Sequence, residues 1–263
     1  MATPNPSHAD LTTVIGALDE FLLATPVKDY GPNGLQVFSG RETVHRIATG
    51  VTANLAFIEK AVQWGADLAV VHHGIYWNGA PVTVTGALGR RIRALIEGKL
   101  SLAAYHLPLD AHSEVGNASC LAQALGFGAE LRTPAFEHRG LPVGCVIDVP
   151  QGMTAQTLLE RVHTTVNPQA LGFLHGPARV SRIGIVTGGA ARDVSRAAAM
   201  RCDAFITGEA GEYSQADARE EGIHFIAGGH HRTERYGPMA LAEWLDARLP
   251  SVAIEFIDID NPV

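Results

Sequence analysis

Hydrophobic positions near the start of the chain repeat first with a helical and then with a strand-like period. From Asp10 to Leu22 apolar residues recur every three or four positions, which predicts a helix that Asp10 caps and Pro26 ends. Residues 46–51 have the pattern of a strand, residues 66–71 form an apolar run typical of a strand buried on both faces, and residues 54–64 between them have a helical period. This order predicts a parallel pair of strands joined by a right-handed crossover helix.

The alternation of helix and strand patterns continues to the end of the sequence. From residue 131 the regular segments become shorter, because Pro134, Pro142 and Pro150 divide the chain into short strand-like pieces. Residues 1–9 show neither pattern, and we expect a loose tail there. The pattern as a whole predicts the α/β class with mostly parallel sheets. The remaining expected helices are 87–97, 116–125, 154–162, 192–200, 214–221 and 238–248, and the remaining strands are 101–105, 143–149, 182–186, 203–207, 224–227 and 252–257.

Two segments align without a gap when the chain is shifted by 136 positions. Residues 47–73 then lie over residues 183–209, and Asp67 falls on Asp203. Both segments have the pattern strand, small-residue turn, helix, strand. Identity between them is low, so a chance match of two strand–helix–strand units is the alternative to duplication. Duplication would give two related α/β domains.

The residues that follow the expected strands are unusually rich in potential metal ligands. The strand of the first repeat runs directly into His72 and His73, and the next strand in each half is followed by His-x3-carboxylate, at 106–110 and 230–234. Ligands of parallel α/β sheets bind beyond the carboxyl ends of the strands, so both halves present nitrogen and oxygen donors where sites form. The candidate metal ligands are His72, His73, Asp110, His230 and Glu234.

A mixed set of imidazoles and carboxylates suits two ions of Zn, Fe, Mn, Co or Ni better than Mg or Ca. Two close ions need a bridging ligand, and we expect Asp110 or Glu234 to supply it through its two carboxylate oxygens. Adjacent side chains on a strand point to opposite faces, so His72 and His73 reach one ion each only if the backbone kinks, which Gly74 would permit. Two such ions lower the pKa of a shared water, which favours hydrolysis of a phosphoester, amide or cyclic C–N bond.

Several neighbouring residues have two interpretations. His106 and Glu209 are candidate catalytic residues, although His106 is alternatively a ligand or a hydrogen-bonded structural histidine. Residues 188–189, both glycine, form either a tight turn into a helix or part of a phosphate-binding loop, and they lack a full phosphate-binding motif. Residues 76–77, Tyr-Trp, are a loop lid, a subunit contact or ordinary loop packing.

Composition narrows the functional classes. The chain of 263 residues has a formal net charge of −7, which disfavours a general nucleic-acid binder because such a protein needs a basic face. Its three cysteines form no CxxC pair, so we expect reduced thiols. The amino-terminal residues do not resemble a signal peptide, and no apolar run reaches the ~18 residues of a membrane span. We therefore expect a cytoplasmic protein.

Five segments resemble the signatures of one family, the NIF-three-like dinuclear metal-centre family of the YbgI type. The resemblance covers nearly the whole chain, and the segments occur in the order of the family. They are NGLQV (33–37), GADLAVVHHG (65–74), YHLPLDAHSEVGN (105–117), CDAFITGEAGEYS (202–214) and AGGHHRTERYG (227–237).

The resemblance implies two interlaced α/β domains in the short form without an inserted domain, which we place at 1–130 with 229–263 and at 131–228. It also implies a ring-shaped homohexamer with a di-metal site facing an inner cavity. Carried over motif by motif, the ligands are the same five residues. Some members are named GTP cyclohydrolase type 2 homologues.

The leading hypothesis is therefore a metal-dependent hydrolase of a nucleotide-like or small heterocyclic or phosphorylated substrate. A non-catalytic metal-binding or regulatory assembly protein is the first alternative. A nucleic-acid-associated ring is the second alternative, which the acidic charge disfavours.

Overall fold

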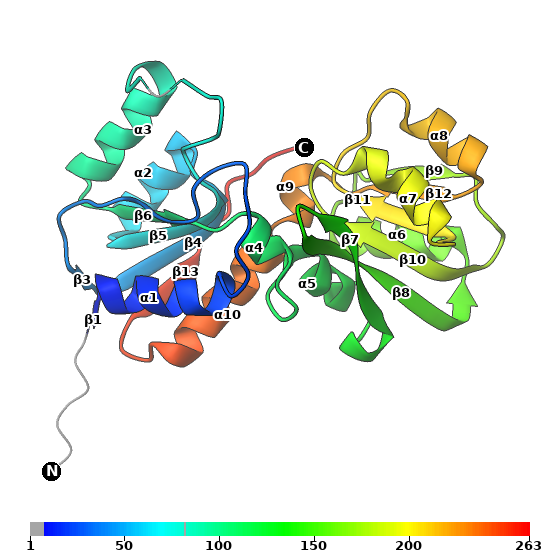
Figure 1. Ribbon diagram of the computed structural model, residues 1–263, viewed down its shortest axis with the longest axis horizontal. Coiled ribbons are helices and arrows are strands. Elements are labelled where there is room, and N and C mark those ends of the chain that lie inside the picture. Colours follow the sequence, from blue (N-terminus) through cyan, green and yellow to red (C-terminus); the bar gives the residue numbers. More distant parts are fainter. Residues whose placement is uncertain (1–7, 82) are drawn as a thin grey trace, which may run out of the picture. The chain divides into compact units, whose positions relative to one another are not determined.

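A computed structural model describes residues 8–81 and 83–263, and it divides the chain into two compact units (Figure 1). The first unit contains residues up to Leu109 together with Pro238–Asp260, and the second contains Asp110–Gly237 and Asn261–Val263. Residues 110–130 and 229–237, which the sequence prediction assigns to the first domain, therefore cluster with the second unit. Most of the expected amino-terminal tail lies outside the described residues.

The first unit is built on a five-stranded sheet in the order β13-β4-β5-β6-β2. Strands β13, β4, β5 and β6 are parallel, and only the edge strand β2 is antiparallel. Helices α2 and α3 cover one face, and α1 and α10 cover the other (Figure 1). The elements are β1 (Ala9–Asp10), α1 (Leu11–Leu22), β2 (Gly34–Val37), β3 (Thr43–Val44), β4 (Arg46–Thr52), α2 (Leu55–Trp64), β5 (Leu68–His73), α3 (Gly86–Glu97), β6 (Ser101–Ala104), α4 (Leu107–Asp110), α10 (Tyr236–Arg248) and β13 (Ala253–Phe256).

Local signals explain the element boundaries that position the candidate site. The side chain of Asn54 caps α2 by accepting a hydrogen bond from the backbone N–H of Phe57 at 2.9 Å. Gly65 ends the helix with a φ of 83°, a conformation that costs glycine little. Strand β5 follows, buried on both faces up to its last residue, His73. The predicted strand–helix–strand unit is therefore present, with its histidines at the carboxyl end of a central strand.

The second unit has a six-stranded mixed sheet in the order β7-β8-β10-β11-β12-β9. Strands β10, β11 and β12 are parallel, and the other pairings are antiparallel. The core on one face joins apolar residues of α5 and α6 to the strands, while α7 and α8 lie on the other face (Figure 1). The elements are α5 (Asn117–Ala124), η1 (Ala129–Leu131), β7 (Arg132–His138), β8 (Leu141–Met153), α6 (Ala155–Thr165), β9 (Leu171–Leu174), β10 (Val180–Val186), η2 (Ala191–Asp193), α7 (Val194–Ala199), β11 (Ala204–Thr207), α8 (Ser214–Glu221), β12 (His224–Ala227) and α9 (His230–Thr233).

The shift of 136 positions found in the sequence is also the shift between the two sheets. Ile47 pairs with Leu68 in the first unit, and the residues 136 positions later, Ile183 and Ala204, pair in the second. Equivalent antiparallel edge strands, β2 and β9, flank the third parallel strand of each unit. The two units therefore share the same central architecture, as the repeat predicts.

The expected state of the thiols and the membrane prediction can be compared with the described part of the chain. Cys120, Cys145 and Cys202 are free thiols. Burial raises the pKa of Cys145 to about 12 and that of Cys202 to about 11, so both thiols stay protonated at neutral pH. No helix within residues 8–81 and 83–263 is long and apolar enough to cross a membrane.

Candidate metal centre

The first cluster lies at the end of β5, where the rings of His72 and His73 are neighbours. Their centroids are 4.4 Å apart with the ring planes tilted by 39°. The two rings therefore lie together, although regular strand alternation would point them to opposite faces. The chain bends just after them, at Ile75, whose N–H donates a hydrogen bond to the Gln36 amide oxygen at 2.9 Å, and this amide occupies the space that a Cβ at Gly74 would need.

His106 completes the cluster from the loop after β6. Its ring centroid lies 5.0 Å from that of His72 and 5.5 Å from that of His73. One ring nitrogen from each of the three histidines lies within 4.8 Å of the others. Three imidazole nitrogens this close together form a group that fits a transition-metal ion.

The Nδ1 atom of each histidine in this cluster has a fixed neighbour. His72 Nδ1 lies 3.2 Å from the backbone oxygen of Tyr105, and His73 Nδ1 lies 3.0 Å from Thr52 Oγ1. Because a carbonyl oxygen only accepts hydrogen bonds, His72 carries its proton on Nδ1, which leaves Nε2 as the nitrogen suited to bind a cation. Both contacts hold the orientation of the rings, and the carbonyl contact also fixes the tautomer of His72, as such contacts do around bound metals.

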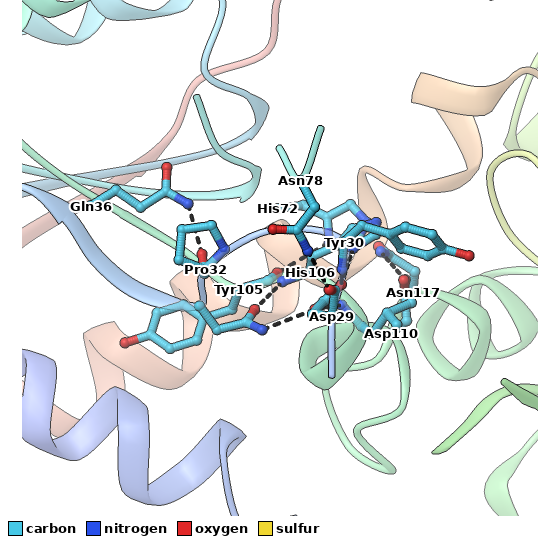
Figure 2. A network of polar contacts seen from close by, with 12 residues as sticks. Asp29, Tyr30, Pro32, Gln36, His72, Asn78, Tyr105, His106, Asp110 and Asn117 are labelled. Atoms are coloured by element: carbon cyan, nitrogen blue, oxygen red, sulfur yellow. Dashed lines mark hydrogen bonds and ion pairs between the residues drawn. The ribbon is translucent and has the colours of Figure 1, made fainter. Parts of the chain in front are cut away.

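Asp29, which the sequence analysis missed, holds His106 in place (Figure 2). Its buried carboxylate accepts hydrogen bonds from His106 Nδ1 at 2.8 Å, Tyr30 N–H at 2.6 Å and Leu107 N–H at 2.9 Å. Asn33 donates to the same carboxylate at 2.9 Å and accepts from His106 N–H at 2.8 Å. Burial alone would raise the pKa of Asp29, but the hydrogen bonds and charge of His106 and the other donors lower it to about 2.

The second cluster is centred on His230, the first residue of α9. His230 Nδ1 lies 2.6 Å from Glu209 Oε1, and its Nε2 lies 3.1 Å from Glu234 Oε2. Burial lowers the pKa of His230, but the hydrogen bonds and charges of Glu234 and Glu209 outweigh it and raise the pKa to about 9. Two donors about 3 Å apart can share a metal ion at bond lengths of about 2.1 Å.

The His-x3-carboxylate segments form one-turn helices instead of strand ends. Residues 107–110 form α4, and residues 230–233 form α9. Residues four positions apart face the same side of a helix, which explains why His230 and Glu234 approach each other. The spacing identified in the sequence is thus meaningful, but its structural cause is helical.

The glycine pair after β10 makes room for this cluster. Gly188 has a φ of 66°, and a Cβ at this position would collide with the carboxylate of Glu234. Thr233 Oγ1 accepts a hydrogen bond from Gly188 N–H at 3.1 Å, and the Gly188 carbonyl accepts from Glu209 N–H at 3.2 Å. Residues 188–189 therefore serve close backbone packing beside Glu234, in agreement with the tight-turn interpretation.

Asp110 is oriented by a residue that the sequence analysis did not single out. Its Oδ1 accepts a hydrogen bond from Asn117 Nδ2 at 2.9 Å, and Asn117 Oδ1 accepts from Gly237 N–H at 2.7 Å. Asn117 is fully buried. It lies at the end of the motif 105–117, which was the only sequence signal that could have drawn attention to it.

These features define an α/β protein of two similar units that carries histidine and carboxylate groups suited to transition-metal ions. The family model Duf34/NIF3 (NGG1p interacting factor 3) matches residues 9–262, and the chain belongs to this family.

The relatives agree with this assignment. A protein of Vibrio cholerae named "GTP cyclohydrolase 1 type 2 homolog" is 43% identical over 94% of this chain and 96% of its own length. A protein of the same name from Escherichia coli K12 is 41% identical over 93% of this chain and 96% of its own length. A solved structure described as protein ybgI of unknown function is 38% identical, with a TM-score of 0.90, and covers 97% of this chain and 100% of its own.

Proposed function

We propose that this protein is a dinuclear metal-dependent hydrolase of a nucleotide-like or small heterocyclic or phosphorylated substrate. Two divalent ions of Zn, Fe, Mn, Co or Ni would be held by His72, His73, Asp110, His230 and Glu234. The observation that carries the proposal is the clustering of imidazole and carboxylate donors, each with its orientation fixed, after strands of both related sheets.

The proposed donors belong to both compact units. The first unit offers imidazoles, which bind one ion each, whereas a close pair of ions needs a carboxylate bridge. Glu234 and Asp110 supply carboxylates from the second unit. Since each ion takes roughly four to six donors, two ions would need water or substrate oxygens in addition to the five protein ligands.

The neighbouring residues have roles in this proposal that follow from their contacts. Bound ions of this kind lower the pKa of water and so supply a nucleophile near neutral pH. His106, oriented by Asp29, would transfer a proton to or from the substrate. Glu209, within 2.6 Å of His230 Nδ1, would orient that ligand. The names of the relatives favour a nucleoside triphosphate as the first substrate to test.

Metal analysis combined with a substrate panel tests the proposal. The purified chain should contain two ions per polypeptide, lose hydrolysis when it is stripped of metal and regain it with Mn, Fe or Zn. The double variant His72→Ala/Glu234→Ala should lose both metal and activity, whereas the control His45→Ala/Glu220→Ala, with both side chains exposed, should keep them.

Unchanged activity in His72→Ala/Glu234→Ala would refute the proposal that the protein is a metal-dependent hydrolase. Tight metal binding without turnover of any substrate in the panel would instead establish the non-catalytic metal-binding alternative. Binding to nucleic acid with a steep salt dependence would favour the other alternative, a ring associated with nucleic acid.

The proposal includes a cytoplasmic homohexamer, which rests on the family resemblance. Light scattering coupled to size-exclusion chromatography should give six chains per particle. A monomer or dimer at micromolar concentration would remove the toroid from the proposal while leaving the metal centre untouched.

A further inference from the structure

Two exposed aromatic side chains lie beside His106. Tyr30 is 39% exposed and Trp77 is 37% exposed, so part of each side chain faces solvent. The ring centroid of Tyr30 lies 5.9 Å from that of His106 at an interplanar angle of 67°, and the centroid of Trp77 lies 5.2 Å away at 85°. Trp77 is also 5.7 Å from His73. Both rings therefore stand next to the imidazole cluster of the first unit.

The loops that carry these rings are fastened to each other and to Asp29. Asn78 N–H donates to the carbonyl oxygen of Tyr30 at 2.7 Å, and Asn78 Nδ2 donates to the carbonyl oxygen of Asp29 at 2.9 Å (Figure 2). Gly31 packs so closely against the Tyr76 carbonyl that a Cβ would collide with it. Tyr30 N–H also donates to the Asp29 carboxylate that orients His106, whereas the loop of Trp77 is bonded to the backbone oxygens of Asp29 and Tyr30.

We propose that Tyr30 and Trp77 form a stacking platform that binds the planar heterocyclic ring of the substrate beside His106. The inference rests on the proposed function and narrows its substrate class to compounds with a flat aromatic ring, such as a purine nucleotide. Exposed aromatic faces bind flat rings by stacking with little dependence on their substituents. The polar groups for orientation come from the adjacent histidines. The platform explains why large rings remain exposed on a well-fastened loop pair next to potential metal ligands.

Binding measured through Trp77 tests the platform without any requirement for turnover. The chain has three tryptophans, so the Trp64→Phe/Trp244→Phe variant leaves Trp77 as the only indole. Guanosine triphosphate and guanosine should quench its fluorescence, whereas inorganic tripolyphosphate, which has the phosphates but no ring, should not.

Dissociation constants of the full-length holoprotein variants complete the test. Trp77→Ala and Tyr30→Ala should each weaken guanosine triphosphate binding about tenfold, in line with the loss of one stacking contact, while tripolyphosphate binding stays within twofold. Phe38→Ala is the matched control, because Phe38 is an aromatic residue of the same unit that is 50% exposed. It should change neither constant.

Three outcomes would overturn the platform: equal loss of nucleotide and tripolyphosphate affinity, no loss in either aromatic variant, or no binding of ring compounds by the wild type. A change in particle size in Trp77→Ala, with nucleotide affinity unchanged, would identify the aromatic pair as a subunit contact. Ring-dependent quenching without hydrolysis would support the platform and refute the hydrolase. Hydrolysis that is insensitive to Tyr30→Ala and Trp77→Ala would support the hydrolase and refute the platform.

Discussion

Among the candidate metal ligands, the clearest structural feature is that a second atom of the side chain is already engaged. His72 Nδ1 lies near a backbone oxygen, His73 Nδ1 near a hydroxyl, His230 Nδ1 near Glu209, and Asp110 Oδ1 near the Asn117 amide. These contacts reduce the rotamer entropy that a ligand would lose when it binds an ion. The supporting residues are therefore as open to experiment as the ligands themselves.

Asp29→Asn should separate orientation of His106 from metal binding. The amide cannot reproduce a charged acceptor for Nδ1–H, so we expect turnover to fall by roughly 10–100-fold while two ions remain bound. The ¹⁵N chemical shifts of His106 should report loss of the single Nδ1–H tautomer, an effect that simple destabilisation would not produce. Asp10→Asn is the control, since Asp10 makes no side-chain cap contact. Unchanged turnover and tautomer in Asp29→Asn would disprove a positioning role.

The sequence could reveal the ligand types but not their supports. His72, His73 and the two His-x3-carboxylate pairs are short-range patterns whose residue types have few other uses together. Asp29 and His106 are 77 positions apart, and Asn117 and Gly237 are 120 positions apart. Contacts over such distances depend on the tertiary fold, so periodicity along one chain cannot predict them.

At the scale of elements, the two central sheets repeat a carboxylate contact as well as a topology. Asp67 Oδ2 accepts hydrogen bonds from two successive backbone N–H groups beside the start of β4, at 2.7 and 3.1 Å. Asp203 Oδ2 accepts the equivalent pair beside β10, at 2.7 and 3.0 Å. The carboxylate thereby fastens the beginning of one parallel strand to the beginning of the next. A chance resemblance would not reproduce these contacts at the same spacing.

Asp67→Asn and Asp203→Asn should each lower the free energy of unfolding by about 1.5–3 kcal/mol at pH 7, since each removes charged hydrogen bonds. Burial raises the pKa of Asp67, but the hydrogen bonds from His45, Arg41 and Arg46 outweigh it and hold the pKa below its usual range. The contribution of Asp67 is therefore present above about pH 4 and is lost as the pH falls through the folded pKa.

Denaturant titrations from pH 7 down to pH 3 measure this effect. The stability difference between wild type and Asp67→Asn should shrink on acidification, and Asp246→Asn, on an exposed position of α10, should show no difference. A stability difference between wild type and Asp67→Asn that stays constant with pH would contradict the lowered pKa of Asp67.

Gly188→Ala and Gly222→Ala provide a matched pair for the turn beside Glu234. Both glycines have a φ of 66°, but a Cβ at Gly222 meets nothing within 4 Å, whereas at Gly188 it collides with the Glu234 carboxylate. Gly222→Ala should cost about 1 kcal/mol of unfolding free energy through backbone strain alone. Gly188→Ala should lower the unfolding free energy by more than Gly222→Ala does. It should also lower the bound metal below two ions per chain. Equal metal content in the two variants would show that Glu234 tolerates displacement or does not bind an ion.

The strand–helix–strand units were predictable because their helices and buried strands differ in period. The antiparallel strands are harder to predict from the sequence. β8 has 13 residues, but Pro142 and Pro150 made it look like short pieces with only 143–149 as a strand. β9 has the apolar sequence LGFL and was missed, because four residues carry no readable period. Such strands are defined by the neighbours with which they pair.

At the scale of the whole molecule, the proposed ligands are distributed over both units. His72 and His73 belong to the first unit, whereas Asp110, His230 and Glu234 belong to the second. The chain passes from one unit to the other at residues 109–110, 237–238 and 260–261, so Asp110 and Glu234 lie close in sequence to the first two of these boundaries.

If these residues hold two ions as proposed, metal removal should lower the stability of the chain. An ion present at about a thousand times its dissociation constant stabilises the state that binds it by about 4 kcal/mol. The holoprotein should therefore unfold in one transition at a higher temperature, and the stripped protein should show a lower and broader or divided transition in calorimetry. His72→Ala/Glu234→Ala should behave like stripped protein whether or not metal is added. If stripping leaves a single transition at an unchanged temperature, the folded chain does not bind the ions as proposed, because a ligand that binds only the folded state must raise its stability.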